Sequence, residues 1–332
     1  MNASPADVAA ICEGRQGDPF AVLGQHRTAE GLCALRVFLP GAARVTAVSA
    51  DGGAPFDELR LCDPEGFFEG VIPGEQAESY LLHVQWRSGE TDLLEDPYRF
   101  PMLLDDLDLW LLAEGSHLRP YEALGAEPMD CLGVAGTRFT VWAPEASSVG
   151  VVGDFNHWDG RRFPMRLHRG CGVWEVFLPG VGAGARYKFE IRTRDGAVLP
   201  QTADPYARRA ELRPATASIV ATLPPMVPPD ERRRLANAHD APFSIYEVHA
   251  GSWRRADDPQ RPFLGWDALA DELIPYAVDL GFTHLELLPV SEHPFDGSWG
   301  YQPTGLYAPT ARHGDPMALR RFIARAHASG LG

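Results

Sequence analysis

The stretch Trp299-Gly300-Tyr301-Gln302-Pro303-Thr304-Gly305-Leu306-Tyr307-Ala308-Pro309-Thr310 follows an apolar run, residues 284–290, that is typical of a buried strand. A strand that leads into a long aromatic loop rich in glycine and proline is how barrel enzymes build a binding face. Flat aromatic rings in such a loop suit flat-faced ligands, sugars among them. The alternative is a surface loop whose tyrosines pack on the scaffold.

The residues around this loop predict a parallel α/β fold. Residues 243–249 and 283–290 predict two strands, the second almost continuously apolar, as parallel strands are. Apolar residues at helical spacing predict two helices, residues 266–280 and 316–329. Their predicted inward faces are Leu269, Leu273, Ile274, Tyr276, Ala277 and Leu280 in the first, and Leu319, Phe322, Ile323 and Ala326 in the second. This order predicts the opening of a parallel α/β fold. The 91 residues from 242 to 332 would form about two of the eight units of a (β/α)₈ TIM barrel, which needs about 250 residues.

The residues before the barrel segment contain an internal repeat. Phe38-Leu39-Pro40-Gly41-Ala42-Ala43-Arg44-Val45 matches Trp142-Ala143-Pro144-Glu145-Ala146-Ser147-Ser148-Val149, and Asp96-Pro97-Tyr98 matches Asp204-Pro205-Tyr206. Short strands punctuated by glycine, proline and aspartate describe a β-sandwich of about 100 residues. The sequence therefore predicts two tandem immunoglobulin-like sandwiches, all-β, in a multidomain chain.

These patterns predict five segments along the chain. The expected boundaries are an N-terminal β-sandwich at 1–102, a connector at 103–125, a second β-sandwich at 126–225, a proline-rich linker at 226–241 and an incomplete barrel at 242–332. Within the connector, residues 105–112 predict a strand or turn, followed by a short helix. Proline blocks both ladder and helix hydrogen bonds, which favours a boundary after residue 223.

Composition excludes several classes of partner. The net charge of −15 argues against nucleic acid and anionic membranes, which both require basic patches. We find no apolar run of about 18 residues and no signal peptide. The five cysteines show no C-x-x-C spacing, which favours free thiols in a reducing cytoplasm. We therefore expect a cytoplasmic protein, a monomer, with no cofactor and no metal.

Two motifs carry a family resemblance. Ser298-Trp299-Gly300-Tyr301-Gln302-Pro303-Thr304-Gly305-Leu306-Tyr307-Ala308-Pro309 closely resembles the loop after the second barrel strand of bacterial 1,4-α-glucan (glycogen) branching enzymes, in the α-amylase superfamily. Tyr246-Glu247-Val248-His249-Ala250-Gly251-Ser252-Trp253 resembles their first barrel strand. The resemblance implies a glycosyltransferase of glycogen biosynthesis. Such an enzyme cleaves an α-1,4-glucan and transfers the segment to a 6-hydroxyl by a retaining mechanism.

The same resemblance implies substrate-binding residues in the loop. Tyr301 would stack on the sugar whose bond is cleaved, and its alternative is a packed core tyrosine. Gln302 and Trp299 are weaker candidates, because Trp299 is more often a loop anchor.

A second resemblance concerns the second sandwich. Val152-Gly153-Asp154-Phe155-Asn156-His157-Trp158-Asp159 and Arg186-Tyr187-Lys188-Phe189-Glu190 resemble starch- and glycogen-binding modules. By that resemblance Trp158 stacks on a sugar and Lys188 donates to hydroxyls. The alternative is that Trp158 fills the sandwich core or an interface. The first copy lacks this pair, which favours a structural or chain-anchoring role.

No catalytic residue is predicted within the chain. Retaining enzymes need two carboxyl groups about 5–5.5 Å apart. The resemblance places the nucleophilic aspartate and the acid/base glutamate beyond Gly332. Glu286 and Glu292 are the nearest acidic pair, and the family does not use them. We therefore expect an N-terminal part, truncated within the barrel and inactive as given.

Two alternatives stay open. One is another enzyme of the amylase superfamily, a debranching enzyme or a trehalose-releasing hydrolase; Gly305 argues against it, because hydrolases commonly carry an acidic or amide residue there. The other is a non-catalytic glycan-binding protein.

Overall fold

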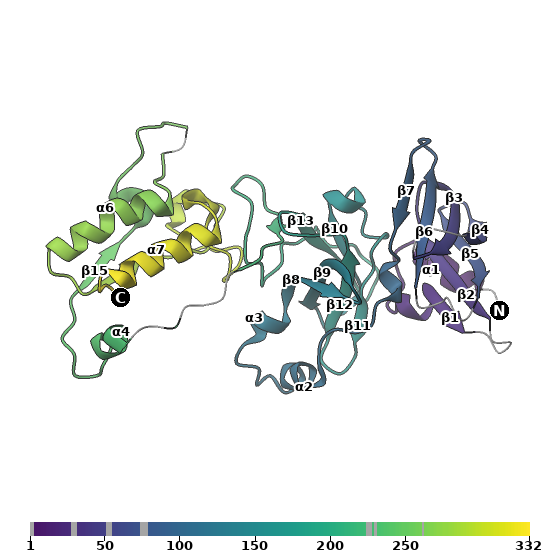
Figure 1. The fold of residues 1–332 in the computed structure, drawn as a ribbon, viewed down its shortest axis with the longest axis horizontal. Helices are drawn as coiled ribbons and strands as arrows, with labels where there is room; N and C mark the ends of the chain where they lie inside the picture. Colours follow the sequence, from purple (N-terminus) through teal and green to yellow (C-terminus); the bar gives the residue numbers. More distant parts are fainter. Residues whose placement is uncertain are drawn as a thin grey trace. The chain divides into compact units, whose positions relative to one another are not determined.

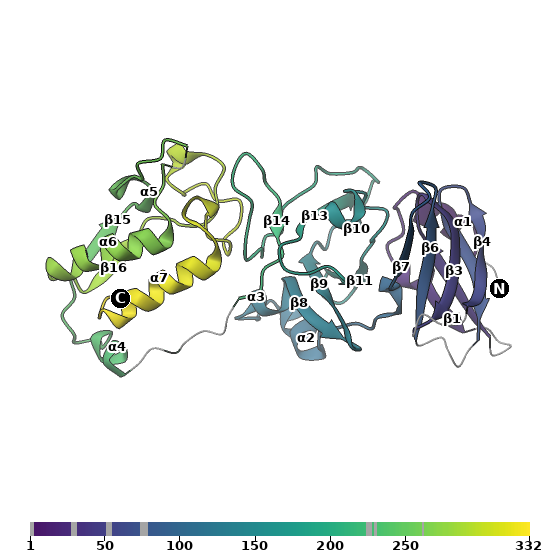
Figure 2. The same ribbon diagram turned by 45° about the horizontal axis from the view of Figure 1, so that its top comes forward.

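The computed structural model describes residues 3–27, 32–50, 55–73, 79–223, 228, 231–260 and 262–332, without the side chains of residues 232 and 235. Of the predicted linker at 226–241, residues 226, 227, 229 and 230 lie outside this description. The chain divides into two compact units, Met1–Thr202 and Ala203–Gly332 (Figures 1 and 2). No helix in the described part is long and apolar enough to cross a membrane.

The first sandwich begins with a capped helix and continues, among its described residues, as seven strands. Helix α1 (Pro5–Cys12) starts at Ser4, whose hydroxyl accepts from the Asp7 amide at 3.1 Å, as the sequence predicts. A short 3₁₀ turn, η1 (Pro19–Ala21), follows. The strands pair in the order β1-β2-β5-β4-β3-β6-β7. They are β1 (Gly24–Arg27), β2 (Cys33–Phe38), β3 (Ala42–Ser49), β4 (Pro55–Asp63), β5 (Phe67–Ile72), β6 (Tyr80–Trp86) and β7 (Thr91–Leu94).

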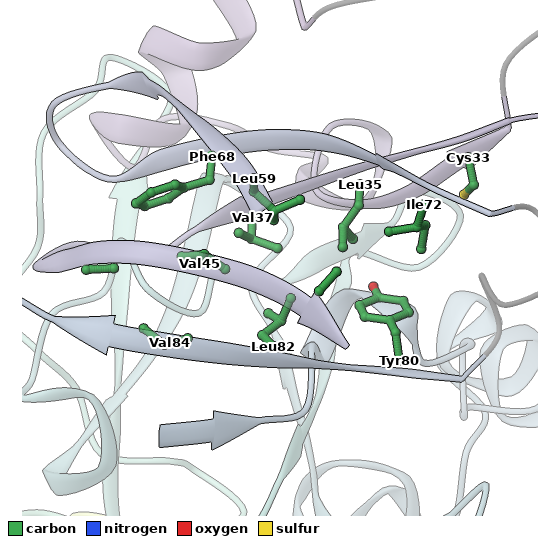
Figure 3. Packing of buried hydrophobic residues seen from close by; sticks show 12 residues of the cluster. Cys33, Leu35, Val37, Val45, Leu59, Phe68, Ile72, Tyr80, Leu82 and Val84 are labelled. Atoms are coloured by element: carbon green, nitrogen blue, oxygen red, sulfur yellow. The ribbon is translucent and has the colours of Figure 1, made fainter. Parts of the chain in front are cut away.

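Strand β4 joins the two layers of this sandwich. Its first half pairs with β3, where Val45 lies opposite Leu59, and its second half pairs with β5, where Leu61 lies opposite Phe68. A strand that changes partners in this way turns one sheet into two facing layers. Figure 3 shows the core between them: side chains of β2 and β5, such as Leu35, point toward those of β3 and β6.

The connector after the first sandwich is helical. The 3₁₀ turn η2 (Pro97–Arg99) leads to α2 (Asp106–Glu114) and α3 (Pro120–Ala123). The strand or turn predicted at residues 105–112 is wrong. The Asp105 carboxylate accepts from the Asp108 amide at 2.7 Å, and Gly115 ends the helix at a φ of 69°. These two caps stabilise a helix that spans this apolar run.

The second sandwich repeats the pairings of the first. Its strands are β8 (Gly125–Cys131), β9 (Val134–Trp142), β10 (Ala146–Gly153), β11 (Arg166–His168), β12 (Val173–Pro179) and β13 (Arg186–Thr193). The pairs β8·β9, β9·β12, β11·β12 and β10·β13 correspond to β1·β2, β2·β5, β4·β5 and β3·β6. The matching stretches at Pro40 and Pro144 both connect corresponding strands, so the predicted repeat is structural.

The unit Ala203–Gly332 contains a parallel pair of strands covered by helices. Its elements are β14 (Ser218–Ile219), α4 (Glu231–Ala236), β15 (Ile245–Val248), α5 (Ala250–Trp253), α6 (Trp266–Asp279), β16 (His284–Leu287), η4 (Asp296–Ser298), η5 (Ala311–His313) and α7 (Pro316–Ala328). Strands β15 and β16 pair in parallel, as predicted, but each is shorter than predicted. The α6 and α7 helices pack their buried faces together over this pair, around Trp266 and Phe322.

The predicted helix faces need correction at three positions. Tyr276 and Leu280 in and after α6, and Ile323 in α7, are 38%, 57% and 41% exposed. The contact between the two helices falls on Leu269, Leu273 and their neighbours, so Leu280 and Ile323 lie outside the buried cluster, while the Tyr276 ring lies against the rings of Tyr246 and Trp253.

Candidate functional site

The loop after β10 holds Trp158 in an unusual backbone conformation. His157 and Trp158 have φ angles of 57° and 61°, a left-handed region that non-glycine residues rarely adopt twice in succession. Asn156 is buried and fixes the loop: it accepts from the Gly153 amide at 2.9 Å and donates to the Val151 carbonyl at 2.8 Å. Such strain persists only where neighbouring contacts over-determine it, and it clusters at functional sites.

Gly153 is required where this loop begins. A Cβ there would overlap the carbonyl oxygen of Arg186 on the neighbouring strand and approach the Phe155 ring to 2.5 Å. The loop therefore leaves β10 in close contact with β13. This close approach accounts for the glycine of the motif in physical terms.

An aspartate sets the direction of the indole. The Trp158 Nε1–H donates to Asp154 Oδ1 at 3.1 Å, and the Arg186 guanidinium donates to Asp154 Oδ2 at 2.7 Å. Arg186 also lowers the pKa of Asp154, so the carboxylate stays charged. Gln201 donates to the Trp158 carbonyl at 3.3 Å. Trp158 is partly exposed, so it does not fill the sandwich core.

Lys188 lies on the same face of the second sandwich. Its neighbours Tyr187 and Phe189 are buried, so the alternating side chains of Arg186, Lys188 and Glu190 point to the opposite face of β13. Arg186 contacts Asp154, and the Glu190 carboxyl lies against Gly160. The residues on either side of Lys188 thus reach both ends of the Trp158 loop.

A second candidate site lies at the carboxyl ends of β15 and β16, where parallel folds place their ligands. His249 follows β15, and its ring stacks on Trp299 with centroids 5.3 Å apart. Trp299 is therefore held by a ring contact while remaining 54% exposed. Tyr301 is 67% exposed and does not pack in the core, and Gln302 is also exposed. Sugar contacts by these three residues stay predictions.

A buried ion-pair network anchors the base of this loop. Arg312, with 3% of its side chain exposed, donates to Glu292 Oε1 at 2.8 Å and to Asp296 Oδ1 at 2.6 Å. Arg213 also pairs with Asp296, and its hydrogen bonds lower the pKa of that carboxyl to about 2. Glu292 Oε2 accepts from the Ala311 amide at 2.6 Å. Glu292 therefore serves as an anchor, and Glu286 on β16 is exposed.

Sequence reasoning missed the residues that position these candidates. Asp154, Asn156 and Arg186 hold the Trp158 loop, and Asp296 and Arg312 hold the Tyr301 loop. Part of the signal was available, since Asp154 and Asn156 lie inside the quoted motif. The contact between Asp154 and Arg186 joins residues 32 positions apart. Only the register of β10 against β13 brings them together.

Two family models match the chain. Residues 4–98 match the N-terminal domain of alpha-1,4-glucan branching enzyme GlgB, and residues 123–207 match carbohydrate-binding module 48, the isoamylase N-terminal domain. The first match confirms a resemblance to branching enzymes, and the second confirms the resemblance of the second sandwich to carbohydrate-binding modules; the motifs at 246–253 and 298–309 lie outside both matches. Residues 4–98 are thus similar to a branching-enzyme N-terminal domain, and residues 123–207 to the immunoglobulin-like modules of family 48.

A solved structure from Salmonella typhimurium, provisionally described as an alpha amylase, is also similar, with 25% identity and a TM-score of 0.48. The match covers 63% of this chain and 32% of that one, so the chain spans about a third of that protein's length.

Proposed function

We propose that the protein is a 1,4-α-glucan branching enzyme of glycogen biosynthesis, which cleaves an α-1,4-glucan and transfers the segment to a 6-hydroxyl. The observation that carries the proposal is the strained loop that presents Trp158 after β10, with Lys188 on the paired strand β13, within a segment matching carbohydrate-binding module 48. The ring offers an apolar face to a sugar, and the ammonium offers donors to its hydroxyls. The branching-enzyme-type N-terminal domain supports the choice of this enzyme within the superfamily.

We further propose that residues 242–332 are the opening of a (β/α)₈ barrel, following sandwiches at 1–102 and 126–225 and the intervening connector and linker. The parallel pairing of β15 and β16 supports this proposal. Trp299, Tyr301 and Gln302 then line the substrate path at the carboxyl ends of the strands. Gly300 has a φ of 90°, and a Cβ there would overlap the Pro289 carbonyl oxygen, which favours glycine at the bend that presents Tyr301.

Glucan binding tests the module in the 332-residue chain. Native gels containing glycogen should retard the wild type, with an affinity nearer millimolar than nanomolar because one ring and one ammonium make the contact. Trp158→Ala should weaken binding at least about tenfold, which corresponds to about 1.4 kcal/mol. Trp158→Phe should restore part of it, because a ring remains.

Trp110→Ala is the matched control, since Trp110 on α2 is 58% exposed and outside the loop. Its retardation should equal that of the wild type. Circular dichroism checks that each variant is folded. Wild-type protein that migrates unretarded would refute the proposed role of Trp158.

The 332-residue chain itself is expected to form no branches. A retaining mechanism needs two carboxyl groups about 5–5.5 Å apart, and Glu292 is committed to Arg312 and to the loop base. The assay is formation of α-1,6 linkages from amylose, read from the loss of iodine colour and from debranching. Branching above a no-protein control would contradict this part of the proposal.

A further inference from the structure

A large cleft lies between the two sandwiches of the unit Met1–Thr202. Its volume is about 740 Å³, within the range of about 300–1,000 Å³ that ligand sites occupy. One wall comes from the end of the β6–β7 hairpin, with Trp86 and Asp92, and the other from the loop after β10, with His157 and Arg162. Figures 1 and 2 both show β7 on the side of the first sandwich nearest the second.

Hydrogen bonds across the two sandwiches hold these walls in place. Arg162 Nη2 donates to the Pro40 carbonyl at 2.6 Å, and the Tyr98 hydroxyl donates to the Pro164 carbonyl at 3.3 Å. On another part of the interface, the Ser148 hydroxyl donates to the Gly14 carbonyl at 2.9 Å. A cleft held in this way costs little ordering when a ligand enters.

The wall of the cleft combines an aromatic ring with groups of both charges. Trp86 packs against the core of the first sandwich, and its indole N–H donates to Asp92 at 2.6 Å. The Arg162 guanidinium carbon lies 5.9 Å from the Trp86 ring centroid, near the outer limit of a cation–π contact. Arg162 Nε is buried and has no hydrogen-bond partner among the described residues.

This chemistry fits a neutral polyhydroxy ligand. The exposed carboxylates of Glu90 and Asp92 can accept from hydroxyls, and Arg162 can donate to them. A basic peptide would meet the Arg162 cation, and an anionic ligand would meet the two carboxylates. Both charged classes are therefore disfavoured relative to a sugar chain.

We propose that this inter-sandwich cleft is a second binding site for a linear α-glucan, separate from the site at Trp158. The proposal rests on the proposed function, that the protein binds α-glucans. The two sites share one loop, since His157 lines the cleft and Trp158 forms the other site. A chain that reaches both sites gains affinity from the high effective concentration at the second.

Fluorine NMR of the 332-residue chain labelled with 5-fluorotryptophan can separate the two sites, because Trp86 and Trp158 give individual signals among eight tryptophans. The probe is maltoheptaose, and single Trp→Phe variants assign the signals. The Trp86 signal should shift saturably in the wild type and in Trp158→Ala. Arg162→Met should abolish the Trp86 shift and leave the Trp158 shift, while the Trp110 signal stays fixed throughout.

Each other outcome is decisive. A shift at Trp158 without one at Trp86 overturns the cleft site and leaves the proposed function standing, whereas no shift at either overturns both. If the Trp86 shift disappears in Trp158→Ala, the shift depends on binding at Trp158, and a separate cleft site is overturned. A shift caused by a lysine-rich peptide but not by maltoheptaose assigns the cleft to a basic peptide. If Arg162→Met does not fold, Asp92→Asn replaces it, and an unweakened Trp86 titration there overturns the proposal.

Discussion

Removal of Arg312 should loosen the base of the loop that carries Tyr301. In Arg312→Met the Glu292 carboxylate, 7% exposed, loses its cation. Breaking one partner of a buried ion pair costs about 3–5 kcal/mol. Glu292 still accepts hydrogen bonds from the Ala311 amide and the Thr310 hydroxyl, so the cost should lie near the lower end of this range. The Asp296 half of the network adds little, because that side chain is 44% exposed.

A local cost of about 3 kcal/mol corresponds to a roughly hundredfold larger population of the open loop, at about 1.4 kcal/mol for each factor of ten in the equilibrium constant. Hydrogen exchange measures this directly at the backbone amides that close the loop. The Thr310 amide donates to the Val290 carbonyl at 2.7 Å, and the Thr304 amide to the Glu292 carbonyl at 2.9 Å. Both amides should exchange roughly a hundredfold faster in the variant.

Arg321→Met is the matched control, with the same change in the same unit. Arg321 pairs with Asp267, and both side chains are more than half exposed, so solvent screens the pair and its loss should have little effect on stability. Exchange at Thr304 and Thr310 should be unchanged in this control. Equal exchange in Arg312→Met and Arg321→Met would refute the view that the network holds the loop.

Three further predictions concern the two sandwiches and the connector between them. Burial raises the pKa of Asp96 to about 6. The protonated carboxyl therefore adds about 3 kcal/mol to the free energy of unfolding below pH 4, and this stabilisation is lost as the pH rises through 6. The free energy of unfolding of Asp96→Asn, measured in urea relative to the wild type, should therefore rise by about 3 kcal/mol between pH 4 and pH 7. A difference between the two proteins that does not change with pH would contradict this. Gly150→Ala should destabilise the second sandwich by about 1–3 kcal/mol, because the added Cβ would overlap the Gly160 carbonyl oxygen. The control is Gly182→Ala, where the added Cβ meets open space, and its stability should change by less than about 0.5 kcal/mol. Exchange of the β10 and β13 amides distinguishes the two, and equal effects would count against the packing argument. Asp105→Ala should cost α2 about 1 kcal/mol, measured by exchange of the Asp108 amide, and unchanged exchange would show that the cap contributes nothing.

The sequence repeat predicted the larger part of the fold. Turn residues such as Pro40 and Pro144 recur at similar spacing because the same pair of strands must be connected in each copy. Helix α2 was missed because its apolar residues show no one-sided pattern, and only the caps at Asp105 and Gly115 favour a helix. The buried faces of α6 and α7 were predicted too wide, because sequence periodicity does not show how much of a stripe a neighbour will cover.

The candidate sites were predictable at their aromatic residues and not at their supports. Trp158 and Tyr301 stand in motifs that can be read locally. The ionic contacts that orient them, Asp154 with Arg186 and Arg213 with Asp296, connect residues 32 and 83 positions apart. Such pairs depend on strand register and on the path of long loops, which single-sequence patterns do not specify.

The double pairing of β4 limits how the first sandwich can meet other chains. Two separate sheets would have four exposed edges, but within the described residues this folded sheet has two, at β1 and β7. Both edge strands are four residues long, and they carry Arg27 and Asp92. Short, charged edges offer a poor template for an added strand. The first sandwich should therefore resist edge-to-edge aggregation at the high local concentrations that a polymer substrate creates.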